Sequence, residues 1–155
     1  AHVCGVNSEE WIREIKIFEE LVKKITELSN KKSYTVISAD HGLTNVPKEN
    51  RFHITYNENV NIYGDQRSVY INGSKKEIIE IFSKVPGQLI DRSELNYLLP
   101  VPENDFIESL YPDYCFLVED KNIIYPHHLK TELAGYHGGL STEEIKIPII
   151  EISNF

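Results

Sequence analysis

Apolar residues recur at steps of three or four near the start of the chain, which is the spacing of one face of an amphipathic helix. The positions of this stripe are Trp11, Ile15, Phe18, Val22, Ile25 and Leu28. Ser8 precedes the stripe and is a suitable N-cap, and the "NKKS" segment at 30–33 is typical of a helix end. The pattern predicts a helix from about residue 9 to residue 30.

Two longer apolar segments are expected to be strands. "YTVIS" at 34–38 is rich in β-branched residues and has the pattern of a buried strand. "IKIPIIEI" at 145–152 has the same character, with Pro148 marking a sheet edge or the start of pairing. A helix followed by a buried strand is the repeat of an α/β sheet, so the predicted fold class is α/β.

Between about residues 45 and 133 the elements become shorter and turn signals more frequent. The expected strands are "RFHITYN", "RSVYING" and "CFLVED", and the expected helices are "KKEIIEIFSKV", "SELNYLL" and "DFIESLY". Ser74 and Glu77 have capping-box spacing at the start of the first of these helices. This stretch is interpreted as a small α+β cap or insertion subdomain within one domain that spans 1–155.

Composition excludes several classes of function. The 155 residues carry a net charge of −8, which argues against a nucleic-acid partner because phosphate backbones require a basic patch. The apolar runs are too short to span a membrane. Cys4 and Cys115 have neither disulfide-framework nor thiolate-zinc spacing, which favours a reducing, cytoplasmic compartment. An anionic substrate of such an acidic chain would need bound cations to attract it.

Three histidines stand beside glycine-containing turns at the ends of predicted elements. Asp40 and His41 follow the strand at 34–38, His137 lies in "GYHGGLS", and His2 precedes "VCGVNSEE". Carboxylate oxygens and imidazole nitrogens are good ligands for zinc and similar ions. Taken singly, each residue also fits an ordinary turn or surface loop, but together they predict one metal site.

Three segments carry a resemblance to a known family. "AHVCGVNSEE", "SADHGL" and "AGYHGGLSTEEIKIPII" resemble segments of the alkaline phosphatase superfamily, most closely its type I phosphodiesterase and nucleotide pyrophosphatase branch. The resemblance implies an alkaline phosphatase-like sheet sandwiched by helices, and a hydrolase with two divalent ions, zinc or manganese. It implies that His2 and His137 hold one ion, that Asp40 and His41 hold the other, and that the substrate is a small phosphate ester or nucleotide.

The sequence departs from the family pattern at its start. The family's remaining metal-binding aspartates and its threonine or serine nucleophile precede the segment that matches His2, so this chain has no catalytic nucleophile of its own. The expectation is therefore the C-terminal part of a larger catalytic domain, inactive alone, with partial or no metal occupancy. A sheet that lacks its first strands would also expose an edge for self-association.

Several alternatives stay open at this point. A phosphomutase, sulfatase or phosphonate hydrolase of the same superfamily would share these ligands, and a noncatalytic binding module would use the histidines as turn residues. Arg67 is expected to contact a substrate phosphate or to form a salt bridge, and Tyr136 to cover the site or fill the core. His127 and His128 are a candidate metal-binding pair, but adjacent residues of an extended segment point in opposite directions, so a surface loop is expected. His53, Glu143 and Glu144 are expected to be solvated, although Ser141 and Glu144 also have capping-box spacing that would hold the His137 loop.

Overall fold

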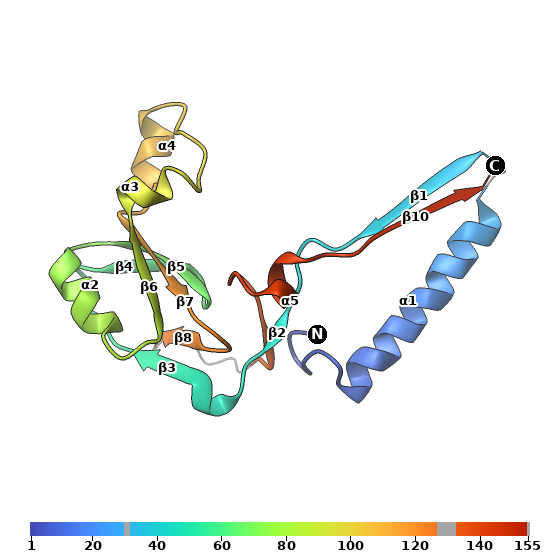
Figure 1. Cartoon of the computed structure of the whole chain (residues 1–155), viewed down its shortest axis with the longest axis horizontal. Coiled ribbons are helices and arrows are strands. Elements are labelled where there is room, and N and C mark those ends of the chain that lie inside the picture. The colour runs from blue at the N-terminus through green and yellow to red at the C-terminus, as the bar shows by residue number, and fades with distance from the viewer. Residues whose placement is uncertain (30–31, 127–132, 155) are drawn as a thin grey trace. The chain divides into compact units, whose positions relative to one another are not determined.

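A computed structural model describes residues 1–29, 32–126 and 133–154 (Figure 1). The chain divides into two compact units, the first formed by Ala1–Asn45 with Glu132–Phe155 and the second by Val46–Thr131. Both units combine helices with short strands. The chain is thus a mixed α/β protein, as the sequence predicted.

Strands from the two ends of the chain pair in the first unit. Its elements are α1 (Glu9–Leu28), β1 (Ser33–Ser38), β2 (Thr44–Asn45), β9 (Gly135–Tyr136), α5 (Thr142–Ile145) and β10 (Ile149–Asn154). β1 pairs with β10 in antiparallel register from Ser38↔Ile149 onward, and β2 pairs with β9 in the same sense. The pairing begins directly after Pro148, which confirms Pro148 as the start of pairing. The predicted strand at 145–152 thus begins four residues later than expected, and its Ile149 and Ile150 are 67% and 50% exposed, so its predicted burial is wrong.

The predicted N-terminal helix is confirmed as α1. The hydroxyl oxygen of Ser8 accepts a hydrogen bond from the backbone N–H of Trp11 at 3.1 Å, which satisfies one of the free donors of the first turn. The last backbone bond runs from Ser29 N–H to the carbonyl of Ile25. Although α1 has 20 residues, the structure shows no helix in its described parts that is long and apolar enough to cross a membrane.

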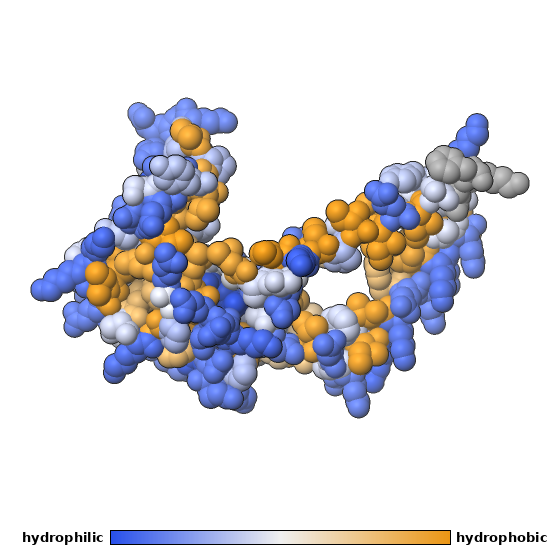
Figure 2. Space-filling view, viewed as in Figure 1, coloured by the Kyte–Doolittle hydropathy of each residue, from blue (hydrophilic) through white to orange (hydrophobic). Residues whose placement is uncertain are grey.

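The apolar sides of α1 and β1 are less covered than the sequence predicted. α1 has no buried residue, and Tyr34 and Val36 of β1 are 58% and 53% exposed. The prediction of a buried strand at 34–38 is therefore wrong in its burial, while its position is right. A pocket of about 290 Å³ separates Phe18 and Val22 from the facing strand. Figure 2 shows apolar surface over β1 and β10 and along the adjoining side of α1.

The second unit contains an antiparallel four-stranded sheet in the order β4-β5-β7-β6. These strands are β4 (Asn61–Asp65), β5 (Ser68–Asn72), β6 (Gly87–Asp91) and β7 (Tyr114–Val118). A separate parallel pair joins β3 (Arg51–Ile54) and β8 (Ile123–Pro126), and the one-turn 3₁₀ helix η1 (Lys48–Asn50) precedes β3. α2 (Lys75–Phe82) contributes Ile78 and Phe82 to a core with Val69, Ile71 and Phe116. The second unit therefore has a hydrophobic core of its own.

Two sequence predictions in the second unit need correction. Ser74 is the N-cap of α2, but its side chain makes no capping hydrogen bond, so the predicted capping box is wrong. β4 and β6 were not predicted, because their segments "NIYGD" and "GQLID" contain glycine and aspartate, which strands disfavour. Both strands are recruited by hydrogen bonding to neighbours that the local sequence does not reveal.

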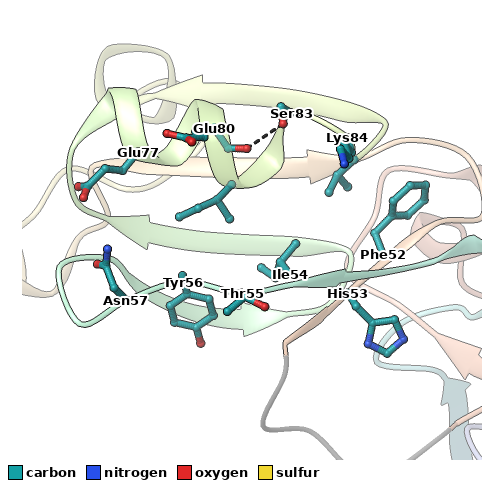
Figure 3. Close-up of a pocket in the computed structure, with 12 residues that line it drawn as sticks. Phe52, His53, Ile54, Thr55, Tyr56, Asn57, Glu77, Glu80, Ser83 and Lys84 are labelled. Carbon is teal, nitrogen blue, oxygen red and sulfur yellow. Dashed lines mark hydrogen bonds between the residues drawn. The ribbon is translucent and has the colours of Figure 1, made fainter.

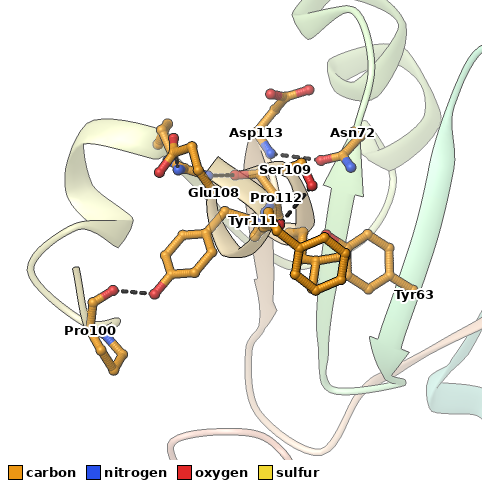
Figure 4. Close-up of polar contacts among 11 residues, drawn as sticks. Tyr63, Asn72, Pro100, Glu108, Ser109, Tyr111, Pro112 and Asp113 are labelled. Atoms are coloured by element: carbon orange, nitrogen blue, oxygen red, sulfur yellow. Dashed lines mark hydrogen bonds and ion pairs between the residues drawn. The ribbon is translucent and has the colours of Figure 1, made fainter. Parts of the chain in front are cut away.

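Two short helices, α3 (Arg92–Leu95) and α4 (Asp105–Leu110), form an arm on the second unit. Figure 4 shows its polar contacts: the Tyr111 hydroxyl donates to the carbonyl of Pro100, and the backbone N–H of Asp113 donates to the side-chain oxygen of Asn72 at 2.9 Å. The Tyr63 hydroxyl donates to the carbonyl of Leu110 at 3.3 Å. The first bond lies within the arm, and the bonds of Asn72 and Tyr63 connect the arm to the β4–β5 hairpin.

Candidate metal centre

The three histidines singled out in the sequence come together in the first unit. The ligand atoms that His2, His41 and His137 offer all lie within 4.8 Å of one another. The ring centroids of His41 and His137 are 3.7 Å apart in a stacked arrangement, and His2 lies 5.3 Å from His137 and 6.1 Å from His41. In the described parts of the chain, this is the one group of three such histidine, cysteine or carboxylate ligands.

His2 is held by residues at and just before β9, near the other end of the chain. Its Nδ1 lies 2.9 Å from the carbonyl oxygen of Gly135, and its own carbonyl accepts from the backbone N–H groups of Ala134 and Gly135. The amide of Asn45 anchors the same loop, because it accepts from the N–H of Val6 at 2.7 Å and donates to the carbonyl of Val6 at 2.9 Å. The N-terminal loop is thus fixed against β2 and β9.

His41 stands just beyond β1, where a close backbone approach orients it. Its Nδ1 lies 2.9 Å from the carbonyl oxygen of Gly42. The N–H of Gly42 donates to the carbonyl of Glu144 at 2.8 Å, and a Cβ on Gly42 would lie 1.9 Å from the carbonyl oxygen of Glu143. Only glycine allows the two backbones to come this close.

His137 follows β9 directly. The preceding residue, Tyr136, is 2% exposed and its hydroxyl accepts from the N–H of Leu133, so Tyr136 fills the core. Gly138, which follows His137, has a φ of 98°, a left-handed conformation that favours glycine. His137 is therefore presented between a buried anchor and a sharp turn.

The donor set fits a divalent metal ion. A carbonyl oxygen can only accept, so the Nδ1 atoms of His2 and His41 carry the hydrogen in these bonds and their Nε2 lone pairs are left for a metal. Two ligands of one tetrahedral zinc ion lie about 3.4 Å apart at zinc–nitrogen distances of about 2.1 Å. The three candidate ligand atoms lie within 4.8 Å of one another, so they are close enough together to serve as ligands at one metal site.

Asp40 lies next to His41 but is not one of the three residues in the histidine group. Its Oδ2 is 3.6 Å from the Nε2 of His41, and its side chain is 88% exposed. Hydrogen bonds from the backbone N–H groups of Asp40 and His41, with the nearby His41 ring, lower the pKa of the Asp40 carboxyl below its ordinary value. An ionised carboxylate beside an available imidazole nitrogen is a suitable pair of ligands for a cation.

Other residues named from the sequence are placed elsewhere. His53 is exposed on β3, as predicted, and His127 and His128 lie outside the described residues. Arg67 is 1% exposed and donates to the carbonyl of Asn122 at 2.6 Å, so it is not available to a substrate phosphate.

The sequence analysis misjudged one residue beside the histidines. Glu144 is 3% exposed, so the prediction of a solvated Glu144 is wrong. Its carboxylate accepts from the N–H of Gly139 at 2.8 Å. Ser141 is the N-cap of α5 but makes no side-chain capping bond, so the predicted capping box is wrong too. The capping-box spacing of Ser141 and Glu144 was the one signal in the sequence that connected Glu144 to the His137 loop.

A pocket of about 630 Å³ in the second unit is a weaker candidate site (Figure 3). Phe52 and His53 line it from β3, and Glu77 and Lys84 line it from the side of α2. In Figure 3 Glu77 and Lys84 lie at opposite ends of the helix, and the ring of His53 points away from both. Because its polar groups do not converge, this pocket lacks the arrangement seen at the histidines.

Comparison with solved structures identifies the fold. Murine ectonucleotide pyrophosphatase / phosphodiesterase 5, an inactive variant in complex with AMP, aligns with a TM-score of 0.68 at 13% identity, over 99% of this chain and 44% of its own. The human protein of the same name gives 0.69 at 12% identity, over 98% and 43%. Phosphonoacetate hydrolase from Sinorhizobium meliloti, in complex with phosphonoacetate, gives 0.68 at 14% identity, over 97% and 42%.

The chain has an alkaline phosphatase-like fold. These solved structures belong to the alkaline phosphatase superfamily, and the likeness covers nearly the whole chain, which confirms the predicted fold class and resemblance. No family model and no curated protein sequence matches the chain. The chain spans less than half the length of the alkaline phosphatase-like proteins that it matches.

Proposed function

We propose that this chain is part of a metal-dependent hydrolase of phosphate esters, of the phosphodiesterase and nucleotide pyrophosphatase type. The observation that carries the proposal is the convergence of His2, His41 and His137 within 4.8 Å. The fold supports the proposal too, because it resembles that of a phosphodiesterase solved in complex with AMP. The substrate would be a small phosphate ester or nucleotide.

The ligands divide between two ions in this proposal. His2 and His137 hold one ion, and Asp40 and His41 hold the second, with zinc or manganese as the metal. Two such ions activate a nucleophile and stabilise the charge on the phosphoryl oxygens of the substrate. The chain's own residues fix the imidazoles, through the bonds from His2 to Gly135 and from His41 to Gly42.

The proposal includes an incomplete active site. Residues 1–155 are the C-terminal part of a larger catalytic domain, and the stretch from about 45 to 133 is its cap or insertion. The nucleophile, a threonine or serine, and further carboxylate ligands come from outside this sequence. An ion with two protein ligands keeps most of its water and binds weakly, so this chain alone is inert and only partly occupied.

The incomplete domain would also leave one edge of β1 without a neighbouring strand. Among the described residues β1 pairs with β10 and with no other strand. An open edge with apolar faces is a template for pairing with another chain. We therefore extend the proposal to self-association of the isolated chain through β1.

A phosphonate hydrolase is the second candidate function. Phosphonoacetate hydrolase aligns with the chain as well as the phosphodiesterase does, with a TM-score of 0.68 in both cases. Both enzymes displace a group at phosphorus, so the same histidine cluster serves either substrate. The choice between a P–O and a P–C bond depends on residues that contact the leaving group.

The test is hydrolysis of bis-(p-nitrophenyl) phosphate and of phosphonoacetate, with zinc or manganese added. Two proteins are compared: the 155-residue chain and a longer version extended upstream through the nucleophile in its natural gene. We expect the longer protein to hydrolyse the diester, His137→Ala to abolish turnover, and the 155-residue chain to be inert. His53→Ala, which removes an exposed histidine of the second unit, is the matched control.

The other outcomes are distinct. Turnover of phosphonoacetate without diester hydrolysis would establish the second candidate instead. Metal binding without either activity would point to phosphomutase or sulfatase chemistry. A longer protein that takes up no metal would contradict the proposal and favour a noncatalytic binding module.

A further inference from the structure

Two loops that carry candidate metal ligands meet at one buried acid, Glu144. The first loop follows β1 and contains His41 and Gly42, and the second follows β9 and contains His137 and Gly139. Glu144 belongs to the short helix α5, which comes after the second loop. Its side chain is 3% exposed, while that of Glu143 is exposed.

Glu144 contacts both loops through different groups. Its backbone carbonyl accepts from the N–H of Gly42, directly after His41, at 2.8 Å. Its carboxylate accepts from the N–H of Gly139, two residues after His137, also at 2.8 Å. One residue therefore connects the backbones that present the stacked rings of His41 and His137, whose centroids are 3.7 Å apart.

Two further features fit these contacts of Glu144: the absence of a side chain at Gly42 and the burial of the Glu144 carboxyl group. Gly42 leaves no room for a side chain, because a Cβ would lie 1.9 Å from the carbonyl oxygen of Glu143. Burying a carboxylate is costly unless the carboxylate is hydrogen-bonded, so a buried acid on a short surface helix needs a specific reason. The hydrogen bond from the backbone N–H of Gly139 gives the buried side chain such a partner. A bond of that kind restrains the glycine-rich loop that follows His137.

We infer that Glu144 is a positioning residue for the histidine cluster: it holds the loops of His41 and His137 in the relative orientation that metal binding needs. This inference rests on the proposed metal-dependent function. Glu144 acts through the loops and is not assigned as a metal ligand. Partners one step removed from a metal commonly change its affinity about 10–100-fold when they are removed.

The test is a titration of the 155-residue chain with Co²⁺, followed by the visible absorption of the bound ion. Glu144→Ala removes the acceptor, Glu144→Gln keeps an oxygen that can accept from Gly139, and Glu143→Ala is the matched control one residue away. We expect Glu144→Ala to weaken Co²⁺ binding about 10–100-fold and to alter the absorption spectrum. Glu144→Gln and Glu143→Ala should stay close to the unsubstituted chain in both respects.

Thermal unfolding without metal separates positioning from stability. If Glu144→Ala lowers the unfolding temperature but its folded form binds Co²⁺ with unchanged affinity and spectrum, Glu144 is structural only and the inference is wrong. If Glu144→Ala does not fold, Glu144→Asp decides, because it keeps the charge on a shorter side chain: unchanged Co²⁺ binding by that variant overturns the inference. If the unsubstituted 155-residue chain binds Co²⁺ too weakly to measure, the same titration is made with the longer protein and its Glu144→Ala variant. Absence of Co²⁺ binding by the longer protein contradicts the proposed function, whereas equal Co²⁺ binding by the longer protein and its Glu144→Ala variant overturns the inference alone.

Discussion

The Nδ1 of His2 lies 2.9 Å from the carbonyl oxygen of Gly135, a residue 133 positions later in the sequence. This bond orients the ring of His2 toward His137, which follows β9 by one residue. Its donor and acceptor come from opposite ends of the chain, so it forms only when the N-terminal loop lies against β9. Assembly of the candidate metal centre should therefore be cooperative with folding of the first unit.

Replacing a histidine of the cluster should weaken zinc binding by the chain. We expect His2→Ala to lower zinc binding at least about tenfold, because it removes a ligand and leaves the carbonyl of Gly135 without this donor. Isothermal titration with zinc measures this. His53→Ala, on exposed β3, should bind zinc like the unsubstituted chain. Equal zinc binding by all three proteins would contradict the histidine assignment.

Gly42→Ala should destabilise the first unit. The added methyl group would lie 1.9 Å from the carbonyl oxygen of Glu143, so the β1 loop and α5 must move apart. We expect a loss of about 1–3 kcal/mol in the free energy of unfolding, the usual cost of overpacking, measured by urea denaturation. Ser38→Ala, an exposed change on the same strand, is the control. An unchanged urea midpoint for Gly42→Ala would contradict the close approach of the Gly42 and Glu143 backbones.

The two cysteines should differ in reactivity. Burial raises the pKa of the Cys115 thiol to about 11, so almost none of it is thiolate at pH 8. We expect iodoacetamide to modify Cys4, which is half-buried, and to leave Cys115 unmodified until the chain is unfolded. Mass spectrometry of tryptic peptides measures this, and Cys4→Ser should remove the fast modification. Rapid labelling of Cys115 in the folded chain would contradict its burial.

The raised pKa of the Cys115 thiol also makes the free energy of unfolding decrease at high pH. The folded state favours the protonated thiol, so its contribution to stability is fully present below the ordinary thiol pKa of 9.0 and decreases as pH rises toward about 11. We expect Cys115→Ala to flatten the decrease in the free energy of unfolding across this window. Cys4→Ala is the comparison. An identical slope for the Cys115 variant and the unsubstituted chain would show that the thiol does not contribute.

Removal of Arg67 should destabilise the second unit. Its side chain is 1% exposed and donates to the carbonyl of Asn122 at 2.6 Å. Asn122 lies in the turn between β7 and β8, so the bond joins the β4–β5 turn to the β7–β8 turn. Loss of a buried, charge-assisted hydrogen bond predicts a decrease of about 1.5–3 kcal/mol in the free energy of unfolding for Arg67→Ala. Lys76→Ala, an exposed change on α2, should have little effect. If both variants unfold at the same urea concentration, Arg67 has no structural role.

The sequence by itself determined the local elements and the candidate ligands of this protein. The stripe from Trp11 to Leu28 predicts α1, the β-branched run predicts β1, and Pro148 marks the start of β10, because periodicity and turn chemistry act over a few residues. His2, Asp40, His41 and His137 were identified from their positions beside glycine turns and from a family resemblance. Glycine-containing β4 and β6 escaped prediction, since their strand conformation depends on neighbours.

Only the tertiary structure decided which of these residues meet. β1 pairs with β10 and β2 pairs with β9, and these pairings, with the bonds from His2 to Ala134 and Gly135, bring together three histidines that are separated by up to 135 positions in the sequence. Glu144, which the sequence pattern had assigned to solvent, is buried beside the loop of His41, while Arg67 is buried by packing within the second unit. Burial and long-range hydrogen bonds depend on contacts between distant segments, and no local pattern of polar and apolar residues encodes those contacts.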